Sequence, residues 1–147
     1  MAGGLSYTLA QINPTVGALP ANRDKIIKAW SATDCDLIIF PEMCICGYPP
    51  EDLVLKPFFI EEIAKIIEEL CAHSASYPAA ALISAPTTID GRVYNTALLI
   101  DGGKIIHTQA KHHLPNYGVF DEVRVFAPGQ MPDVVAFRGA TLGILTC

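Results

Sequence analysis

Three residues that could catalyse acyl transfer each follow an apolar segment of the 147-residue chain. Glu42 comes after LIIFP, Lys111 after IIHTQA and Cys147 after GILT. If the apolar segments are neighbouring strands, these side chains converge at one edge of a sheet, where α/β proteins usually bind ligands. The sequence therefore predicts one site that combines a carboxylate, an ammonium and a thiol.

The chemistry of this set is amide hydrolysis through a thioester. A thiol has a pKa of about 8.5 and is mostly protonated near neutral pH, so a carboxylate that accepts its proton activates it. The ammonium can stabilise the oxyanion that forms when the thiolate attacks an amide carbon. The carboxyl group then protonates the leaving amine, and its carboxylate activates a water.

Each residue also has a structural interpretation. Free cysteine is among the most buried residue types and often only packs in a core. A glutamate or lysine at a strand end is usually solvated. His107, His112 and His113 offer an alternative, a metal site or a histidine-activated thiol, although their segments look like strand and loop surface. The spacing of the residues does not decide between these interpretations.

The cysteines do not form a pattern typical of a metal site. Structural zinc usually has four ligands in C-x₂₋₄-C pairs, whereas Cys44 and Cys46 form a C-x-C and the other cysteines show no pairing. Five cysteines without an export signal are interpreted as reduced thiols. We therefore expect no metal and a cytoplasmic location.

The composition disfavours binding to nucleic acid or insertion into a membrane. The formal net charge is −5, whereas nucleic-acid binding needs clustered Lys and Arg. No apolar run approaches the roughly 18 residues of a membrane span. Charged residues make up only 17% of the chain, against about 25% on average. We expect another subunit, another domain or the rest of the same domain to cover part of the surface.

The elements that must position the site alternate between strands and helices. Apolar patterns predict strands at 7–13, 35–42, 80–89, 95–100, 104–111, 133–139 and 140–147, the last of them buried on both faces. Helices are predicted at 23–33, with Asn22 as the N-cap, and at 57–74, with Pro57 in the first turn. The irregular segment 112–131 is long enough to be functional. This order predicts a layered α/β (α+β) fold.

Three motifs, in this order, give a family resemblance. The stretches IIFPEMCICGYPPEDL, KHHLPNYGVFDEVRVFAPG and LGILTC resemble the nitrilase (carbon–nitrogen hydrolase) superfamily. GYPPEDL and LPNYGVFDE are similar to the N-terminal glutamine amidotransferase domains of glutamine-dependent NAD synthetases, and general nitrilases typically lack both. The resemblance covers essentially the whole chain and implies part of a four-layer α-β-β-α sandwich.

The resemblance also implies roles for the site residues. Glu42 corresponds to the general base, Lys111 to the residue that stabilises the oxyanion, and Cys147 to the nucleophile. The remaining matches are Tyr117 and Phe120, at positions that help to bind glutamine, and Glu122, a second carboxylate that supports the lysine.

The implied activity is hydrolysis of L-glutamine to glutamate and ammonia. In this family the ammonia passes to a C-terminal synthetase domain, which amidates deamido-NAD and is expected to need ATP and magnesium. The glutaminase domain itself needs no cofactor. The expected partners are therefore L-glutamine and the synthetase domain, and we also expect a homo-oligomer.

The chain departs from the family pattern at Cys147, where the sequence stops. The family continues with an acidic residue and further strands, so we expect residues 1–147 to be the N-terminal portion of a nitrilase-like glutaminase domain. Two other interpretations stay open. One is a stand-alone nitrilase-type amidase for another amide or a nitrile, and the other is an inactive fragment that serves only in assembly.

Overall fold

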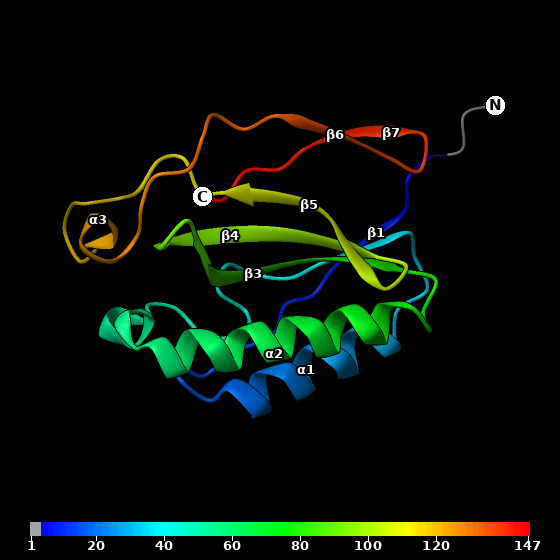
Figure 1. Ribbon diagram of the computed structural model, residues 1–147. Coiled ribbons are helices and arrows are strands. Elements are labelled where there is room, and N and C mark those ends of the chain that lie inside the picture. Colours follow the sequence, from blue (N-terminus) through cyan, green and yellow to red (C-terminus); the bar gives the residue numbers. More distant parts are fainter. Residues whose placement is uncertain (1–3) are drawn as a thin grey trace.

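The computed structural model describes residues 4–147, which form three layers (Figure 1). Helices α1 (Leu19–Ser31) and α2 (Pro57–Ser74) cover one face of a five-stranded sheet. A hairpin of β6 (Val134–Phe137) and β7 (Ala140–Gly143) lies over the other face. The predicted α/β fold is confirmed, and these layers are three of those that an α-β-β-α sandwich contains.

The main sheet has the strand order β1-β2-β3-β4-β5. Its strands are β1 (Tyr7–Leu9), β2 (Leu37–Ile39), β3 (Ala80–Ile89), β4 (Arg92–Asp101) and β5 (Lys104–Ala110). The first three are parallel, and β4 is antiparallel to both β3 and β5. As a result β2, β3 and β5 run in the same direction, and their carboxyl ends lie at the same edge of the sheet.

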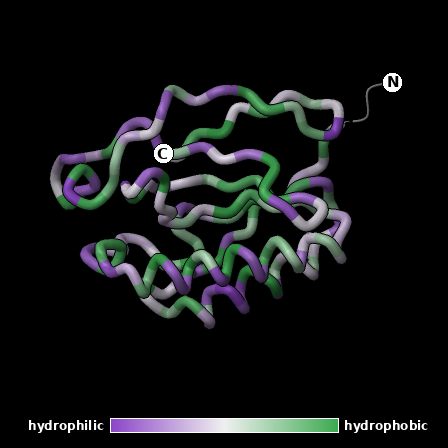
Figure 2. The backbone as a smooth tube through the Cα atoms, in the orientation of Figure 1, coloured by the Kyte–Doolittle hydropathy of each residue, from purple (hydrophilic) through white to green (hydrophobic). Residues whose placement is uncertain are grey.

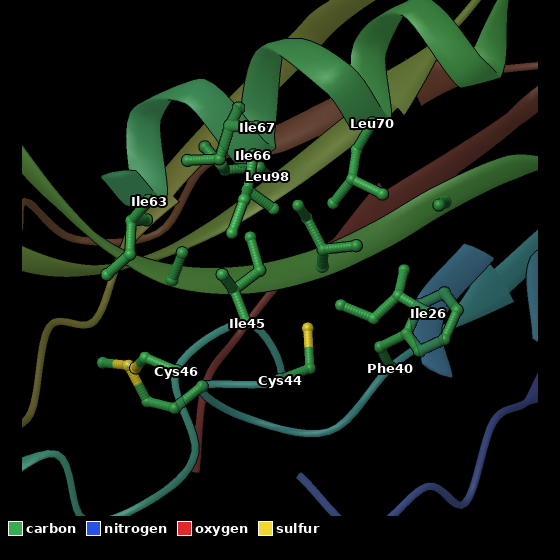
Figure 3. Close-up of a cluster of buried hydrophobic side chains, with 14 of the residues drawn as sticks. Ile26, Phe40, Cys44, Ile45, Cys46, Ile63, Ile66, Ile67, Leu70 and Leu98 are labelled. Carbon is green, nitrogen blue, oxygen red and sulfur yellow. Dashed lines mark hydrogen bonds between the residues drawn. The ribbon is translucent and has the colours of Figure 1, made fainter. Parts of the chain in front are cut away.

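The helices pack on the sheet through a continuous apolar core (Figure 3). Helix α2 begins at Pro57 as predicted, because a proline in the first turn costs no hydrogen bond. Its inward face carries Phe59, Ile63, Ile66, Ile67 and Leu70, all buried. Burying one such side chain fully stabilises the fold by about 1.5–3 kcal/mol. Figure 2 shows the corresponding alternation of hydrophobic and hydrophilic residues along the helices.

A smaller apolar cluster holds the hairpin to the opposite face. It contains Leu37, Ala80, Ala97, Leu99, Phe137 and Ile144. At the hairpin turn the guanidinium of Arg138 donates hydrogen bonds to the carbonyl oxygen of Pro78 (2.6 Å) and to Asp101 Oδ1 (2.9 Å). The hairpin is therefore fixed to the main sheet before the chain continues to Cys147.

The first helix begins earlier than predicted. It starts at Leu19, and Pro20 lies in its first turn, so Asn22 is a residue of the helix rather than its N-cap. The Asn22 side chain is fully buried instead. It accepts from the Thr15 backbone N–H at 2.8 Å and donates to the carbonyl oxygens of Thr15 (2.8 Å) and Ile45 (3.0 Å). Asn22 thus joins two loops, a role that a local pattern cannot indicate.

The prediction of a last strand at 140–147 that is buried on both faces is wrong. Strand β7 ends at Gly143, and β6 pairs only with residues 140–143. Ile144 turns into the apolar cluster under the hairpin, whereas Leu145 is 74% exposed. The first two strands are also shorter than predicted, because only Tyr7–Leu9 and Leu37–Ile39 pair with a neighbour.

Candidate active site

Glu42 and Lys111 form an ion pair at the carboxyl edge of the sheet. Lys111 Nζ lies 2.7 Å from Glu42 Oε1, and the Lys111 side chain is 1% exposed while that of Glu42 is 23% exposed. Their strands are not neighbours, because β3 and β4 lie between β2 and β5. The two side chains meet nevertheless, since both strands end at the same edge and Glu42 lies in a turn that follows β2.

The backbone around Lys111 is held from both sides. Its N–H donates to the carbonyl oxygen of Asn95 at 2.7 Å, and its carbonyl oxygen accepts from the N–H of Gly129 at 2.8 Å. Gly129 approaches so closely that a Cβ there would lie 2.4 Å from the carbonyl oxygen of Ala110. A glycine is therefore required where the chain passes the end of β5.

A second carboxylate completes the surroundings of the lysine. Glu122, the first residue of the short helix α3 (Glu122–Val125), is buried, and its Oε1 lies 3.0 Å from Lys111 Nζ. The same oxygen accepts from the Tyr48 hydroxyl at 2.8 Å. Burial and the Glu122 carboxylate both raise the pKa of Tyr48, so its hydroxyl remains a donor.

The two carboxylates keep Lys111 charged. Burial of the ammonium lowers the pKa of Lys111, but the hydrogen bonds to Glu42 and Glu122 outweigh it, and the net pKa lies above that of an ordinary lysine. An ammonium has three N–H donors. Two of them bind Glu42 and Glu122, so one remains for a ligand.

Cys147 lies beside this pair and is exposed. It lines a cavity of about 160 Å³ together with Glu42 and Ser84, and a second cavity of about 130 Å³ together with Lys111 and His113. In Figure 1 the C-terminus accordingly lies at the tip of β5. The φ angle of Cys147 is +36°, a region that L-residues rarely adopt and that recurs at functional sites.

The predicted glutamine-binding residues lie on the neighbouring loop. The Tyr117 side chain is 71% exposed, and its ring packs edge-on against Phe120 at 5.5 Å between centroids. Phe120 in turn lies 6.5 Å from the ring of Tyr48. These aromatic rings form a small cluster beside Glu122, in which Tyr117 is the exposed member.

His113 lines a cavity with Lys111 and Cys147, so a histidine-activated thiol stays open as an alternative, whereas the C-x-C pair lies in the apolar core. His112 Nδ1 lies 2.8 Å from the carbonyl oxygen of Gly129, which indicates a role in holding the loop. Cys44 and Cys46 are buried in the core beneath α2, and burial raises the pKa of each thiol to about 12 (Figure 3). The part of the chain that is described contains no group of three or more side chains suited to a metal ion.

Sequence reasoning missed two residues of the site. Tyr48 donates to Glu122, and Asn95 donates from Nδ2 to Glu42 Oε1 at 2.7 Å. Asn95 lies inside β4, and asparagine is depleted in strands, so its presence there is the signal in the sequence that could have indicated a special role. No helix in the described residues combines the length and apolar character needed to cross a membrane.

An α/β fold with a glutamate–lysine pair beside a cysteine is the arrangement of a carbon–nitrogen hydrolase. The model of the carbon-nitrogen hydrolase family matches residues 7–147, and the chain belongs to this family. More particularly, the chain is 40% identical to the glutamine-dependent NAD(+) synthetase of Rhodobacter capsulatus over 100% of its length, which is 27% of that protein. The chain spans about a quarter of the length of such curated relatives.

Solved structures agree with this assignment. The glutamine-dependent NAD+ synthetase of Acinetobacter baumannii superimposes with a TM-score of 0.84 and 35% identity, over 97% of this chain and 27% of that one. An amidase from Nesterenkonia sp. AN1 gives a TM-score of 0.85 with 25% identity, over 98% of this chain and 57% of that one. The fold is thus shared by proteins of both kinds.

Proposed function

We propose that this chain forms part of a glutaminase domain that releases ammonia from L-glutamine, and that Cys147 is its nucleophile. The observation that carries the proposal is the Glu42–Lys111 pair, with N···O at 2.7 Å, whose two members each line a cavity with Cys147. The identity of 40% to a glutamine-dependent NAD(+) synthetase supports glutamine as the substrate.

In the first half-reaction Glu42 accepts the thiol proton, and the sulfur of Cys147 attacks the carboxamide carbon of glutamine. The oxyanion of the tetrahedral intermediate accepts a hydrogen bond from the remaining N–H of Lys111. Glu42 then returns the proton to the amide nitrogen and the carbon–nitrogen bond breaks. Ammonia departs, and a γ-glutamyl thioester remains on Cys147.

In the second half-reaction a water replaces ammonia. Glu42 accepts one proton of the water as its oxygen attacks the thioester carbon, and Lys111 again stabilises the oxyanion. The carbon–sulfur bond breaks, the sulfur takes up the proton that Glu42 holds, and glutamate is released. Tyr117 and Phe120 are proposed to contact the glutamine, and Glu122 to hold Lys111.

The ammonia is proposed to serve a C-terminal synthetase domain of the same protein, which amidates deamido-NAD at the expense of ATP in the presence of magnesium. The test uses the full-length protein that carries this chain. Cys147→Ala should abolish NAD formation from glutamine and leave NAD formation from ammonium salts intact, because the thiol is needed only to release ammonia.

Equal loss of both activities would contradict the proposal and indicate a structural cysteine. Hydrolysis of simple aliphatic amides in preference to glutamine would favour a stand-alone amidase. That alternative has its own support in the TM-score of 0.85 to the Nesterenkonia amidase.

A further inference from the structure

Asn95 contacts both members of the Glu42–Lys111 ion pair. Its side-chain Nδ2 donates to Glu42 Oε1 at 2.7 Å, and its backbone carbonyl oxygen accepts from the N–H of Lys111 at 2.7 Å. The residue is fully buried within β4 and lines neither of the two cavities beside Cys147. One residue of a central strand therefore fixes the relative position of the carboxylate and the lysine.

The orientation of the Asn95 amide follows from the chemistry of its neighbours. The Ser84 hydroxyl lies 3.3 Å from Oδ1 and can donate to it. An ionised carboxylate only accepts hydrogen bonds, so the NH₂ group of Asn95 must face Glu42. A flipped amide would place the Asn95 oxygen against the Glu42 carboxylate, two acceptors facing each other, whereas the Ser84 hydroxyl can pair with either end of the amide.

This contact makes the two oxygens of Glu42 unequal. Oε1 accepts from both Lys111 Nζ and Asn95 Nδ2. Oε2 accepts no hydrogen bond from residues 4–147. If it were buried, it would be an unsatisfied polar atom, but the buried atoms without a partner in these residues are His107 Nε2 and Glu122 Oε2. Glu42 Oε2 is therefore accessible to solvent. The accessible oxygen belongs to the side chain that lines the cavity with Cys147.

We infer that Asn95 is a positioning residue for the proposed glutaminase reaction: it holds Oε1 of Glu42 beside Lys111 and leaves Oε2 to exchange protons with Cys147 and the leaving amine. This inference rests on the proposed function. Without the Asn95 amide, Glu42 keeps a single donor and can rotate about its side-chain torsions, so either oxygen can swing away from the thiol.

Two substitutions in the full-length protein test the role of Asn95. Asn95→Leu removes the donor and roughly keeps the volume, and Asn95→Asp keeps the shape but places a carboxylate against Glu42. For both, kcat for glutamine hydrolysis should fall about 10–100-fold, the range expected when a hydrogen bond to a charged group is lost. KM should stay within about threefold, because Asn95 does not touch the substrate.

The pH profile separates positioning from a general structural role. The ionisable groups around Glu42 are Lys111, Glu122, Cys147 and Tyr48, and all four stay in place in both variants. Loss of the donor disfavours the carboxylate, so the acid limb of kcat/KM should move to higher pH in Asn95→Leu. It should move further in Asn95→Asp, where two facing carboxyl groups share a proton.

Thr96→Val is the matched control. Thr96 is the next residue of β4, equally buried, and its hydroxyl donates to the carbonyl oxygen of Ala85 at 2.8 Å, but its side chain points to the other face of the sheet. This variant loses a buried hydrogen bond without touching Glu42. Its kcat should stay within about threefold of wild type, and its acid limb should not move.

The possible failures are distinguishable. If wild type hydrolyses glutamine through Cys147 but the Asn95 variants keep the wild-type acid limb, or lose activity only as Thr96→Val does, the inference about Asn95 is wrong. If wild type releases no glutamate, or Cys147→Ala still releases it, the proposed function fails and the inference fails with it. The circular dichroism spectrum and the melting temperature of each variant show whether it is folded.

Discussion

Replacing Glu122 by glutamine tests whether this buried carboxylate supports Lys111. Unit charges 3.0 Å apart attract by about 5–6 kcal/mol at an effective dielectric constant of about 20. The glutamine oxygen still accepts a hydrogen bond, so only part of this energy is lost. The measured worth of hydrogen bonds to charged groups, about 1.5–3 kcal/mol, is the better guide. We therefore expect kcat/KM for glutamine hydrolysis to fall about 10–100-fold.

The pH dependence gives this prediction a second readout. Glu42 and Glu122 together raise the pKa of Lys111 against the effect of burial. Removing the charge of Glu122 lowers that pKa, so Lys111 loses its proton at lower pH and the alkaline limb of kcat/KM moves down. The assay is glutamate release from the full-length protein between pH 6 and about pH 11, a range that extends beyond the ordinary lysine pKa of about 10.4.

Glu62→Gln makes the same chemical change on the exposed surface of α2, where Glu62 pairs with Lys65. Exposed ion pairs contribute about 0–1 kcal/mol, and we expect this control to stay within twofold of wild type. A Glu122→Gln variant that matches this control in rate and alkaline limb would refute the view that Glu122 supports the lysine.

Three further substitutions test other parts of the site. Tyr48→Phe removes the donor that lies 2.8 Å from Glu122 Oε1 and should lower kcat about 3–10-fold, whereas an unchanged kcat in the glutaminase assay would mean that Glu122 needs no second donor. Gly129→Ala places a Cβ 2.4 Å from the Ala110 carbonyl oxygen, so it should lower both the melting temperature and kcat, and wild-type values for both would show that the close approach is not needed. Tyr117→Ala removes a ring that is 71% exposed, so it should raise KM for glutamine about tenfold with a smaller effect on kcat, and an unchanged KM would exclude Tyr117 from binding.

The elements with a strong local pattern could be predicted from the sequence. Helix α2 has the predicted bounds, because Pro57 begins it and the spacing of Phe59, Ile63 and Ile66 leaves one apolar face. Strand β3 also has its predicted bounds, 80–89. In both cases the signal lies within the segment itself, so no knowledge of distant residues is needed.

The features that depend on distant residues could not be predicted in this way. An apolar run such as 140–147 indicates burial but not the partner that supplies it, and here β6 pairs with only its first half. Asn22 resembles an N-cap in sequence, yet its side chain contacts the carbonyl oxygen of Ile45, 23 residues away. The roles of Asn95 and Tyr48 could not be predicted for the same reason. Asn95 donates to Glu42 and Tyr48 donates to Glu122, and each of these partners is remote in sequence.

The most direct test of the central claim is to identify the residue that a glutamine analogue with an electrophilic carbon in place of the amide modifies. The full-length protein is treated with the analogue, digested and analysed by mass spectrometry, and both glutamine-supported and ammonia-supported NAD formation are measured. We predict modification at Cys147, protection by L-glutamine, and loss of only the glutamine-supported activity. Cys44 and Cys46 should stay unmodified, because burial raises the pKa of each to about 12. Loss of glutamine-supported activity with Cys147 unmodified would contradict the account.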